Sequence, residues 1–244
     1  MKKLFPILQP LITLIFIFIA CIIYGFSMSP AIIFLNHIIQ VSIEHSLFIE
    51  SKFKFALLIG ATVSLCYFIF GISLILIVGI IFRILPIKPK PGIYSLYSLA
   101  TIKWGLCGAL LRLVNLAFLN FITPTFLNVL YFRLVGIKLG KGVQINTISI
   151  NDPWLLQIGD RTVIGGGASV NGHSVEKGTL ILDTVKIGKD CTIGAGSIIW
   201  PGCTIGDKSI LSTQSVLKRK STIGFKEIWK GNPARNIRLK NKNH

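Results

Sequence analysis

Branched aliphatic residues return at every sixth position over residues 181–217 of this 244-residue chain. A period of six matches neither the 3.6-residue period of a helix nor the alternation of a strand, so it predicts an internal repeat. Three such hexads make one triangular coil of a solenoid, in which the aliphatic corners stack between coils and glycines occupy the sharp turns. The aliphatic positions are Ile181, Ile187, Ile193, Ile199, Ile205, Leu211 and Leu217.

The repeat begins less regularly before this region. It starts near Leu139, pauses at a loop around residues 152–154 and then resumes. The register slips between Val170 and Ile181, which predicts a loop protruding from an otherwise regular prism. We therefore expect a single-stranded all-β solenoid over residues 137–224.

The hexads, together with the sequence Gly-Asn-Pro-Ala-Arg at 231–235, resemble those of the left-handed β-helix acyltransferases of the hexapeptide-repeat class. The left hand comes from this resemblance, because parallel crossovers are normally right-handed. The resemblance implies a homotrimer and an acyl-thioester donor, acetyl-CoA or another acyl-CoA, in the groove between neighbouring subunits. It implies no permanently bound cofactor.

The first half of the chain carries two long apolar runs. Residues 4–26 and 55–85 are nearly uncharged and long enough to span the hydrocarbon core as α-helices. A cleaved signal peptide is the alternative for the first run, because residues 19–21 resemble a lipoprotein site, but the apolar run continues past them. Basic residues flank the pair, and Glu44 and Glu50 lie between the runs, so the positive-inside rule places both ends in the cytoplasm.

Two further segments are expected in the membrane interface. Residues 31–43 are apolar but short, which is typical of an interfacial or tucked-in helix. Residues 99–136 contain Arg112, and because a central arginine is costly in a membrane span, we expect an interfacial helical linker. The predicted organisation is a membrane region at 1–98, this linker, the left-handed parallel β-helix, and a basic C-terminal tail at 225–244.

A narrower resemblance extends over most of the chain. Residues 90–96, 103–104, 123–125 and 132–140 together resemble the membrane-bound C-terminal module of poly-lysine-synthetase-like nonribosomal peptide synthetases. That module couples membrane helices to repeats of this kind. No adenylation or carrier domain is recognisable in the chain, so only the acyltransferase-like module is implied. We expect an integral protein of the bacterial inner membrane with its β-helix on the cytoplasmic side.

The net charge of +17 changes this interpretation little. No acidic residue occurs between Glu50 and Asp152, which is typical of a chain facing anionic lipids. A nucleic-acid partner is not expected, because no recognition helix, RNA-binding signature or aromatic platform accompanies the charge. After Leu217 the chain is again strongly basic, which suits either a solvated or membrane-facing tail or the phosphates of coenzyme A.

His173 is the only histidine inside the repeats, and it lies where the register slips. Acyl transfer requires a base that accepts a proton near neutral pH, which an imidazole does without much tuning. In the resembling enzymes a histidine in a matching Gly-His segment is the general base, so the resemblance gives His173 this role; a surface histidine without function is the alternative. Glu176 is expected to orient the imidazole or to hold the acceptor. A single histidine predicts no metal site, unlike the three-histidine zinc site of a related hydratase.

Small residues near the end of the repeats are expected to contact the donor, because they let a pantetheine arm approach the backbone, whose N–H groups suit an oxyanion. A purely structural role, in the hexad turns and in a cap of the solenoid, explains the same residues. Acceptor contacts are expected from Asn171, Asp152 and Trp154. The expected donor contacts are Gly194, Ala195, Gly196, Gly231, Asn232 and Ala234.

Together these features predict a membrane-anchored acyltransferase. It would move an acyl group, most simply acetyl, from a CoA-type thioester to a hydroxyl or amine of an envelope saccharide, a lipid-linked intermediate or a peptide. Two alternatives remain open. One is the condensation of an aminoacyl or peptidyl donor, and the other is a non-enzymatic trimeric scaffold that anchors partners to membrane lipids.

Overall fold

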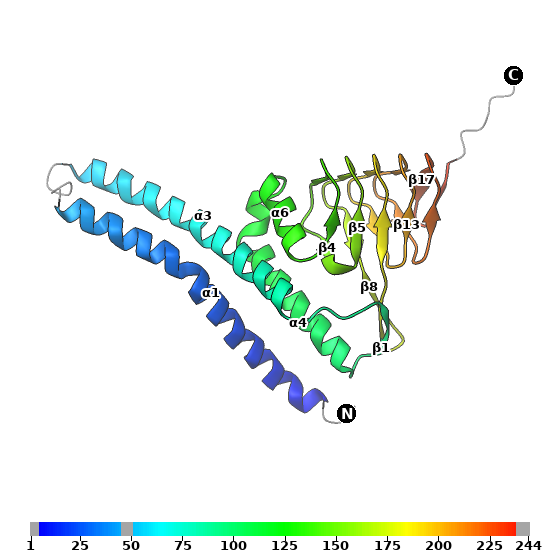
Figure 1. Ribbon diagram of the computed structural model, residues 1–244, viewed down its shortest axis with the longest axis horizontal. Coiled ribbons are helices and arrows are strands. Elements are labelled where there is room, and N and C mark those ends of the chain that lie inside the picture. Colours follow the sequence, from blue (N-terminus) through cyan, green and yellow to red (C-terminus); the bar gives the residue numbers. More distant parts are fainter. Residues whose placement is uncertain (1–4, 45–50, 238–244) are drawn as a thin grey trace, which may run out of the picture. The chain divides into compact units, whose positions relative to one another are not determined.

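The computed structural model describes residues 5–44 and 51–237 of the chain (Figure 1). The chain divides into two compact units between residues 81 and 82. The first unit is helical, and the second contains shorter helices followed by stacked strands. The predicted fold class, N-terminal apolar helices followed by a parallel β-helix, is confirmed.

Two long helices make up the first unit, α1 (Phe5–Glu44) and α3 (Lys52–Ile84), whose last residues belong to the second unit. They pack against each other: the Cys66 thiol donates a hydrogen bond to the Ala31 carbonyl at 3.3 Å, and the Tyr24 and Phe70 rings meet edge to face with centroids 5.9 Å apart. Both helices are long and apolar enough to cross a membrane.

Helix α1 corrects the expectation of a separate short helix at residues 31–43, because these residues continue the first helix without a break. Pro30 lies inside α1, where it removes one backbone hydrogen bond. Two nearby hydroxyls bond to carbonyls of the preceding turn, Ser27 to Ile23 at 2.7 Å and Ser29 to Gly25 at 2.9 Å. These polar side chains are thus satisfied within the helix, and they do not end it.

The second unit begins with a helical segment in which α4 (Leu99–Val114), the π-helix η1 (Asn115–Leu119) and α5 (Asn120–Ile122) follow without a gap. The Ser98 side chain caps α4 by accepting a hydrogen bond from the Thr101 amide at 3.2 Å. The combined helix is a third stretch long and apolar enough to span a membrane, despite its arginine. A short helix, α6 (Phe126–Leu134), leads into the β-helix.

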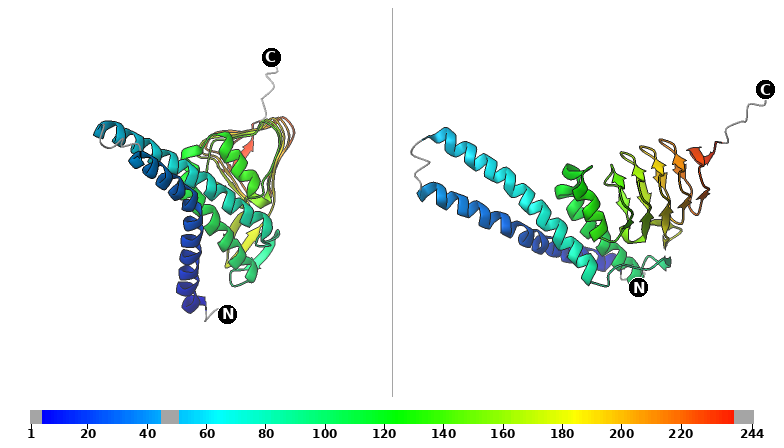
Figure 2. Two further views of the ribbon diagram at one scale, coloured as in Figure 1. Left: turned by 60° about the vertical axis from the view of Figure 1, so that its left-hand side comes forward. Right: turned by 45° about the horizontal axis from the view of Figure 1, so that its top comes forward.

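The β-helix is built from three parallel sheets, and Figure 2 shows its triangular section in the left view and its stacked coils in the right view. One sheet contains β2 (Lys138–Leu139), β5 (Leu156–Ile158), β10 (Val185–Ile187), β13 (Thr204–Ile205) and β16 (Thr222–Ile223). A second contains β3 (Gln144–Ile145), β6 (Val163–Ile164), β11 (Thr192–Ile193), β14 (Ile210–Leu211) and β17 (Ile228–Gly231). The third contains β4 (Ile150–Asn151), β7 (Ser169–Asn171), β12 (Ile198–Ile199) and β15 (Val216–Leu217). We call these the first, second and third sheets.

The hexad positions fill the interior of this prism. Residues six apart fall on successive sheets, and residues eighteen apart stack in register, as Ile187 does on Ile205 and Ile193 on Leu211. These side chains are buried, so the period of six is explained by one inward residue per side of the triangle. The same register continues to Ile223, one hexad beyond the predicted series.

Ile181 is the exception, and its assignment to the prism was wrong. It lies in β9 (Thr179–Leu182), which forms an antiparallel hairpin with β8 (His173–Glu176) outside the coils. A third strand, β1 (Gly92–Ser95), pairs antiparallel with β9. The predicted protruding loop is therefore an ordered three-stranded sheet. Residues 92–95, which the sequence places in the membrane region, form one of its strands, and Tyr94 packs against the buried leucines of this sheet.

The base of this hairpin is held by an apolar cluster. Leu155, Leu180 and Leu182 are buried, and Tyr94 and Trp104 pack against them from the preceding segments. The cluster ties the hairpin, the coil loop at 153–155 and helix α4 together, so it fixes the position of residues at the start of β8.

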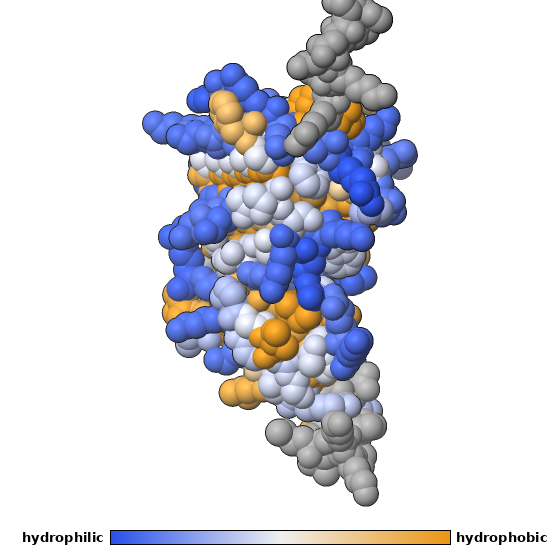
Figure 3. Space-filling model, turned by 90° about the vertical axis from the view of Figure 1, so that its right-hand side faces the viewer, coloured by the Kyte–Doolittle hydropathy of each residue, from blue (hydrophilic) through white to orange (hydrophobic). Residues whose placement is uncertain are grey.

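At the other end of the prism, the chain turns back in an antiparallel hairpin of β17 and β18 (Ala234–Asn236). This hairpin occupies part of the predicted basic tail, whose residues 238–244 lie outside the described residues. The face of the molecule drawn in Figure 3 is mostly hydrophilic, with separate hydrophobic patches.

Candidate active site

A histidine–aspartate pair lies where the hairpin leaves the prism. His173 Nδ1 is 2.6 Å from Asp152 Oδ2, and the Asp152 side chain is only 4% exposed. Among the described residues, none forms a hydrogen bond with the other ring nitrogen, Nε2. When the imidazole is neutral, the carboxylate holds the proton on Nδ1, so the lone pair of Nε2 is available to accept a proton.

The backbone brings these two residues together. Asp152 is in the left-handed conformation (φ 56°) at the start of the short 3₁₀-helix η2 (Pro153–Leu155). Gly172 precedes the histidine, and a Cβ atom there would lie 2.9 Å from Asp152 Cβ. Glycine is therefore required at 172, because only a residue without a side chain permits this approach.

Trp104 completes the pair from helix α4. Its indole Nε1 donates a hydrogen bond to Asp152 Oδ1 at 2.8 Å, and its ring meets the His173 ring edge-on at 4.8 Å between centroids. Both carboxylate oxygens of Asp152 are thus engaged, which fixes the carboxylate and, through it, the imidazole. Sequence reasoning missed Trp104 in this role because 48 residues separate it from Asp152 and no local spacing connects them.

Glu176 does not orient the imidazole, and this expectation is corrected. Glu176 follows His173 by three residues in strand β8, and because side chains alternate along a strand, the two point to opposite faces. Its carboxylate pairs with the Arg219 guanidinium at 2.8 Å and accepts a hydrogen bond from Ser174 at 3.3 Å. With Trp200, Glu176 lines a separate cavity of about 500 Å³.

Two of the three expected acceptor contacts form hydrogen bonds within the protein. The buried Asn171 donates to the Ile199 carbonyl at 3.2 Å, and its Oδ1 accepts from Asn151 at 2.7 Å and from the Ser169 hydroxyl at 3.2 Å. These bonds hold adjacent coils together. Trp154 donates to the Pro89 carbonyl at 3.0 Å and packs against the apolar cluster. The third, Asp152, is the partner of the histidine.

A groove of about 680 Å³ runs beside the pair, between the helical segment α4–η1–α5 and the first coils of the prism. It is lined by polar groups from both sides, and His173 opens onto it. This groove is where an acceptor could reach the imidazole. Its polar lining residues are Trp104, Arg112, Asn115, Asn120, Ser149, Asn151, Asp152, Ser169 and His173.

The six expected donor contacts lie along one edge of the prism. Residues 194–196 form the turn after β11, and residues 231–234 form the turn after β17, with the 212–215 turn between them. The Gln214 amide bonds to the Ala195 carbonyl at 2.9 Å, and the Gly231 amide bonds to the Ser215 hydroxyl at 3.0 Å. A side chain at Gly194 would collide with the Thr213 backbone, so coil stacking alone already requires glycine there.

The donor edge and the histidine occupy different corners of one chain. The edge joins the second sheet to the third, whereas His173 follows β7 at the corner that joins the third sheet to the first. The full width of the third sheet separates them. One chain by itself does not bring the two sets of residues together.

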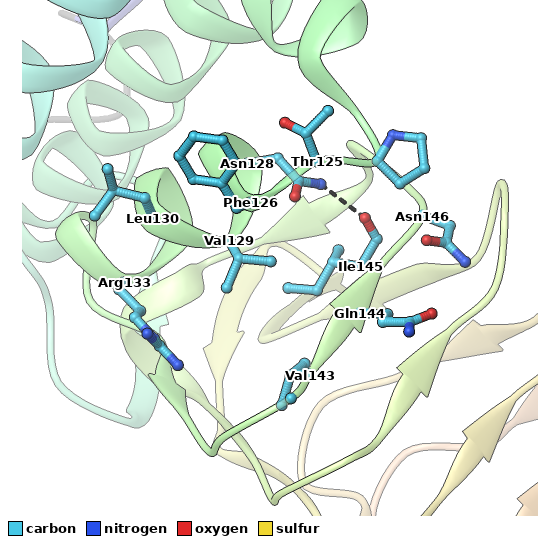
Figure 4. Close-up of a pocket in the computed structure, with 12 residues that line it drawn as sticks. Thr125, Phe126, Asn128, Val129, Leu130, Arg133, Val143, Gln144, Ile145 and Asn146 are labelled. Atoms are coloured by element: carbon cyan, nitrogen blue, oxygen red, sulfur yellow. Dashed lines mark hydrogen bonds between the residues drawn. The ribbon is translucent and has the colours of Figure 1, made fainter.

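A further cavity of about 610 Å³ lies between α6 and β3 (Figure 4). Phe126 and Leu130 of α6 line it, and Asn128 donates a hydrogen bond to the Ile145 carbonyl at 2.7 Å. No aspartate, glutamate or histidine is among its lining residues. It therefore offers no base for acyl transfer.

Comparison with known proteins relates the prism to one family. The bacterial transferase hexapeptide family (six repeats) matches residues 172–207 and 184–219. The chain is 26% identical over 155 residues to the delta-poly-L-ornithine synthetase of Acinetobacter baumannii, covering 64% of this chain and 11% of that protein. It is 28% identical over 131 residues to the putative colanic acid biosynthesis acetyltransferase WcaF of Escherichia coli, covering 43% and 71% of the two chains.

Solved structures with this likeness include a maltose O-acetyltransferase from Clostridium difficile, with a TM-score of 0.47, 21% identity, and coverage of 60% of this chain and 91% of that one. Another is an acetyltransferase from Vibrio cholerae in complex with acetyl coenzyme A, with a TM-score of 0.39, 26% identity, and coverage of 42% and 59%. The chain spans about a tenth of the length of the ornithine synthetase.

Proposed function

We propose that this chain, as a hexapeptide-repeat acyltransferase with a left-handed β-helix, is a membrane-anchored acetyltransferase. It moves an acetyl group from acetyl-CoA to a hydroxyl or amine of an envelope saccharide, lipid-linked intermediate or peptide. The observation that carries the proposal is the His173–Asp152 pair, whose Nε2 has no partner among the described residues and which opens onto a groove.

In this reaction, Nε2 of His173 takes the proton of the acceptor hydroxyl or amine as the acceptor attacks the thioester carbonyl. The tetrahedral intermediate then collapses, the carbon–sulfur bond breaks, and the imidazolium returns the proton to the CoA thiolate. Asp152 stabilises the imidazolium while it exists. The Gly194 and Gly196 amides already donate to the Leu211 and Gly166 carbonyls, at 2.7 and 2.9 Å, so on the donor edge the Ala195 amide would lie against the donor and stabilise the developing oxyanion.

The separation of the two corners supports a homotrimer. If the donor lies along the edge at 194–196 and 231–234, a neighbouring copy has to bring that edge to His173. The outward residues of the second and third sheets include Val163, Ile198 and Ile210, whereas the first sheet presents polar residues such as Lys186 and Thr204. Contact between copies that covers the second sheet beside the donor edge would bury its aliphatic residues.

The helices α1 and α3 supply the proposed membrane anchor, because both are long and apolar enough to span a bilayer. The basic residues that flank the pair favour the cytoplasmic side of a bacterial inner membrane for both ends and for the β-helix. Acetyl-CoA is a cytoplasmic metabolite, so this sidedness agrees with the proposed donor.

The test is transfer of label from [¹⁴C]acetyl-CoA to a bacterial envelope extract by the purified full-length protein. We expect labelled product, and we expect His173→Ala to lower its rate by about 10²–10⁴-fold, the usual contribution of a general base. His37→Ala, in helix α1, is the matched histidine control and should retain activity. Undiminished transfer by His173→Ala would refute the proposed base.

A second candidate is the condensation of an aminoacyl or peptidyl donor, favoured by the similarity to the ornithine synthetase over 64% of this chain. The groove and the base serve either reaction, because an amine also loses a proton as it attacks a thioester. The two are distinguished by offering acetyl-CoA and an ornithyl or lysyl thioester to the same preparation. Faster turnover of the aminoacyl thioester would favour condensation.

A further inference from the structure

Arg112 stands out in the groove beside His173. Its side chain is exposed and lines the groove, and no hydrogen bond or ion pair joins its guanidinium to any of the residues the structure describes. The other titratable groups that line the groove are His173 and Asp152, and both Asp152 oxygens are occupied by the histidine and the Trp104 indole. The groove therefore contains one cation without an internal counter-charge.

Two amides of the same helical segment line the groove with this arginine, Asn115 at the start of the π-helix η1 and Asn120 just after its end. In a regular α-helix, with about 100° per residue, Asn120 would point about 160° away from Trp104, whereas one extra residue in the wide turn reduces this to about 60°. Accordingly, Trp104, Arg112, Asn115 and Asn120 all line the groove. π-Helical turns inside α-helices occur frequently at functional sites, and here the turn keeps a polar row facing the groove.

The spacing indicates the size of the ligand. Arg112 follows Trp104 by eight residues, or roughly 12 Å along the helix axis. Trp104 touches the His173 ring, so it marks the reacting end of the groove. Helical side chains lean toward the N-terminus, which brings the guanidinium closer to that end. A group bound by Arg112 thus lies one to two sugar rings from the reacting oxygen.

We propose that Arg112, with Asn115 one helical turn away, binds the phosphate of a phosphate-bearing saccharide acceptor whose hydroxyl reaches His173. This assignment rests on the proposed function and narrows its acceptor class. Guanidinium groups bind phosphate through paired charge-assisted hydrogen bonds, and asparagine amides add donors of the same kind. Ser149, Asn151 and Ser169 on the opposite wall supply groups for sugar hydroxyls.

Calorimetric binding to the full-length protein in nanodiscs tests this without requiring turnover. The probes are galactose 1-phosphate and galactose. We expect the phosphate to bind about 10- to 100-fold more tightly, as charged hydrogen bonds predict. Arg112→Gln should abolish that preference, and Arg112→Lys should retain part of it. Lys103→Gln removes the same charge from the same helix outside the groove and should leave the preference intact.

Equal affinity for the two sugars in the wild-type protein would overturn the proposal, and so would an unchanged preference in Arg112→Gln. A phosphate preference that depends on Arg112, in a protein that transfers no acetyl group, would uphold the binding site and reject the acetyltransferase. Acetyl transfer that proceeds equally well to neutral and phosphorylated sugars would uphold the acetyltransferase and reject the phosphate site.

The source of the phosphate is resolved by a third probe, galactose linked to a polyprenyl diphosphate in the same nanodiscs. Tighter Arg112-dependent binding of this probe than of galactose 1-phosphate indicates a lipid-linked acceptor. Equal or weaker binding indicates a soluble sugar phosphate. In an activity assay, Arg112→Gln should raise the KM for the preferred probe more than it changes the KM for acetyl-CoA.

Discussion

At the scale of single residues, the carboxylate that contacts His173 decides how the imidazole can act. The sequence identifies His173 as the candidate base but gives no way to choose between nearby carboxylates. Glu176 is three residues away and points to the other face of its strand, whereas Asp152 is 21 residues away and lies 2.6 Å from the ring. Distance along the chain is a poor guide here, because a strand alternates its faces while a coil loop returns to the same corner.

Asp152→Asn should lower kcat by about 10²–10⁴-fold, because an asparagine amide donates to Nδ1 and leaves Nε2 protonated. The KM for acetyl-CoA should stay within about twofold of the wild-type value, since the donor edge is unchanged. Steady-state kinetics of acetyl transfer separate these two effects.

Glu176→Gln is the control for this prediction. It alters a carboxylate that bonds to Arg219 and not to the imidazole, so kcat should change little. A larger loss in Glu176→Gln than in Asp152→Asn would contradict the assigned roles.

At the scale of elements, each two-residue strand of the prism divides its work between an outward and an inward side chain. In β13, Thr204 faces outward and is exposed, while Ile205 is 2% exposed and stacks between Ile187 and Ile223. The interior also contains Cys203, whose burial raises the pKa of its thiol to about 11 and keeps it protonated at neutral pH. This thiol therefore packs as a small apolar group.

Ile205→Ala should destabilise the β-helix by about 2–5 kcal/mol, because it removes buried methylene and methyl groups and leaves a cavity between two coils. Thr204→Ala, on the same strand, should change the stability by less than about 0.5 kcal/mol. Denaturant unfolding of the full chain in detergent, followed by tryptophan fluorescence, measures both. Similar losses in the two variants would contradict the inward stacking of the hexads.

At the scale of the whole molecule, the candidate base and the donor edge lie at different corners of the prism. The proposed site therefore includes a neighbouring copy of the chain. The second sheet presents Ile210, which is 38% exposed, near the donor edge. The first sheet presents threonine and lysine at the matching positions. An outward aliphatic residue on one sheet and a polar one on another is the pattern expected when only the former is covered by a neighbour.

We expect three chains per particle for the wild-type protein by mass photometry in detergent. Ile210→Lys should dissociate it and abolish transfer, because a charge would be buried between copies. Thr204→Lys, on the polar first sheet, is the matched control and should remain trimeric. A monomeric wild-type protein with full activity would rule out a shared site.

Features that repeat or continue locally could be predicted from the amino-acid sequence. The period of six predicts the prism because every coil needs one inward aliphatic residue per side, and the apolar runs predict long helices because composition alone limits where they are stable. The same reasoning correctly located a protrusion at the slip in register. It divided α1 into two segments, because the polar Asn36 and His37 interrupt residues 31–43, whereas the apolar residues around them continue as one helix.

Which distant residues contact each other depends on how the elements pack in three dimensions. The contacts of Trp104 with Asp152, of Asp152 with His173, and of β1 with β9 join segments from 21 to about 90 residues apart. No periodicity connects such segments, because their approach depends on how the hairpin and α4 pack around Leu155, Leu180 and Leu182. The repeat thus specified the scaffold, and the apolar packing beside it specified the site.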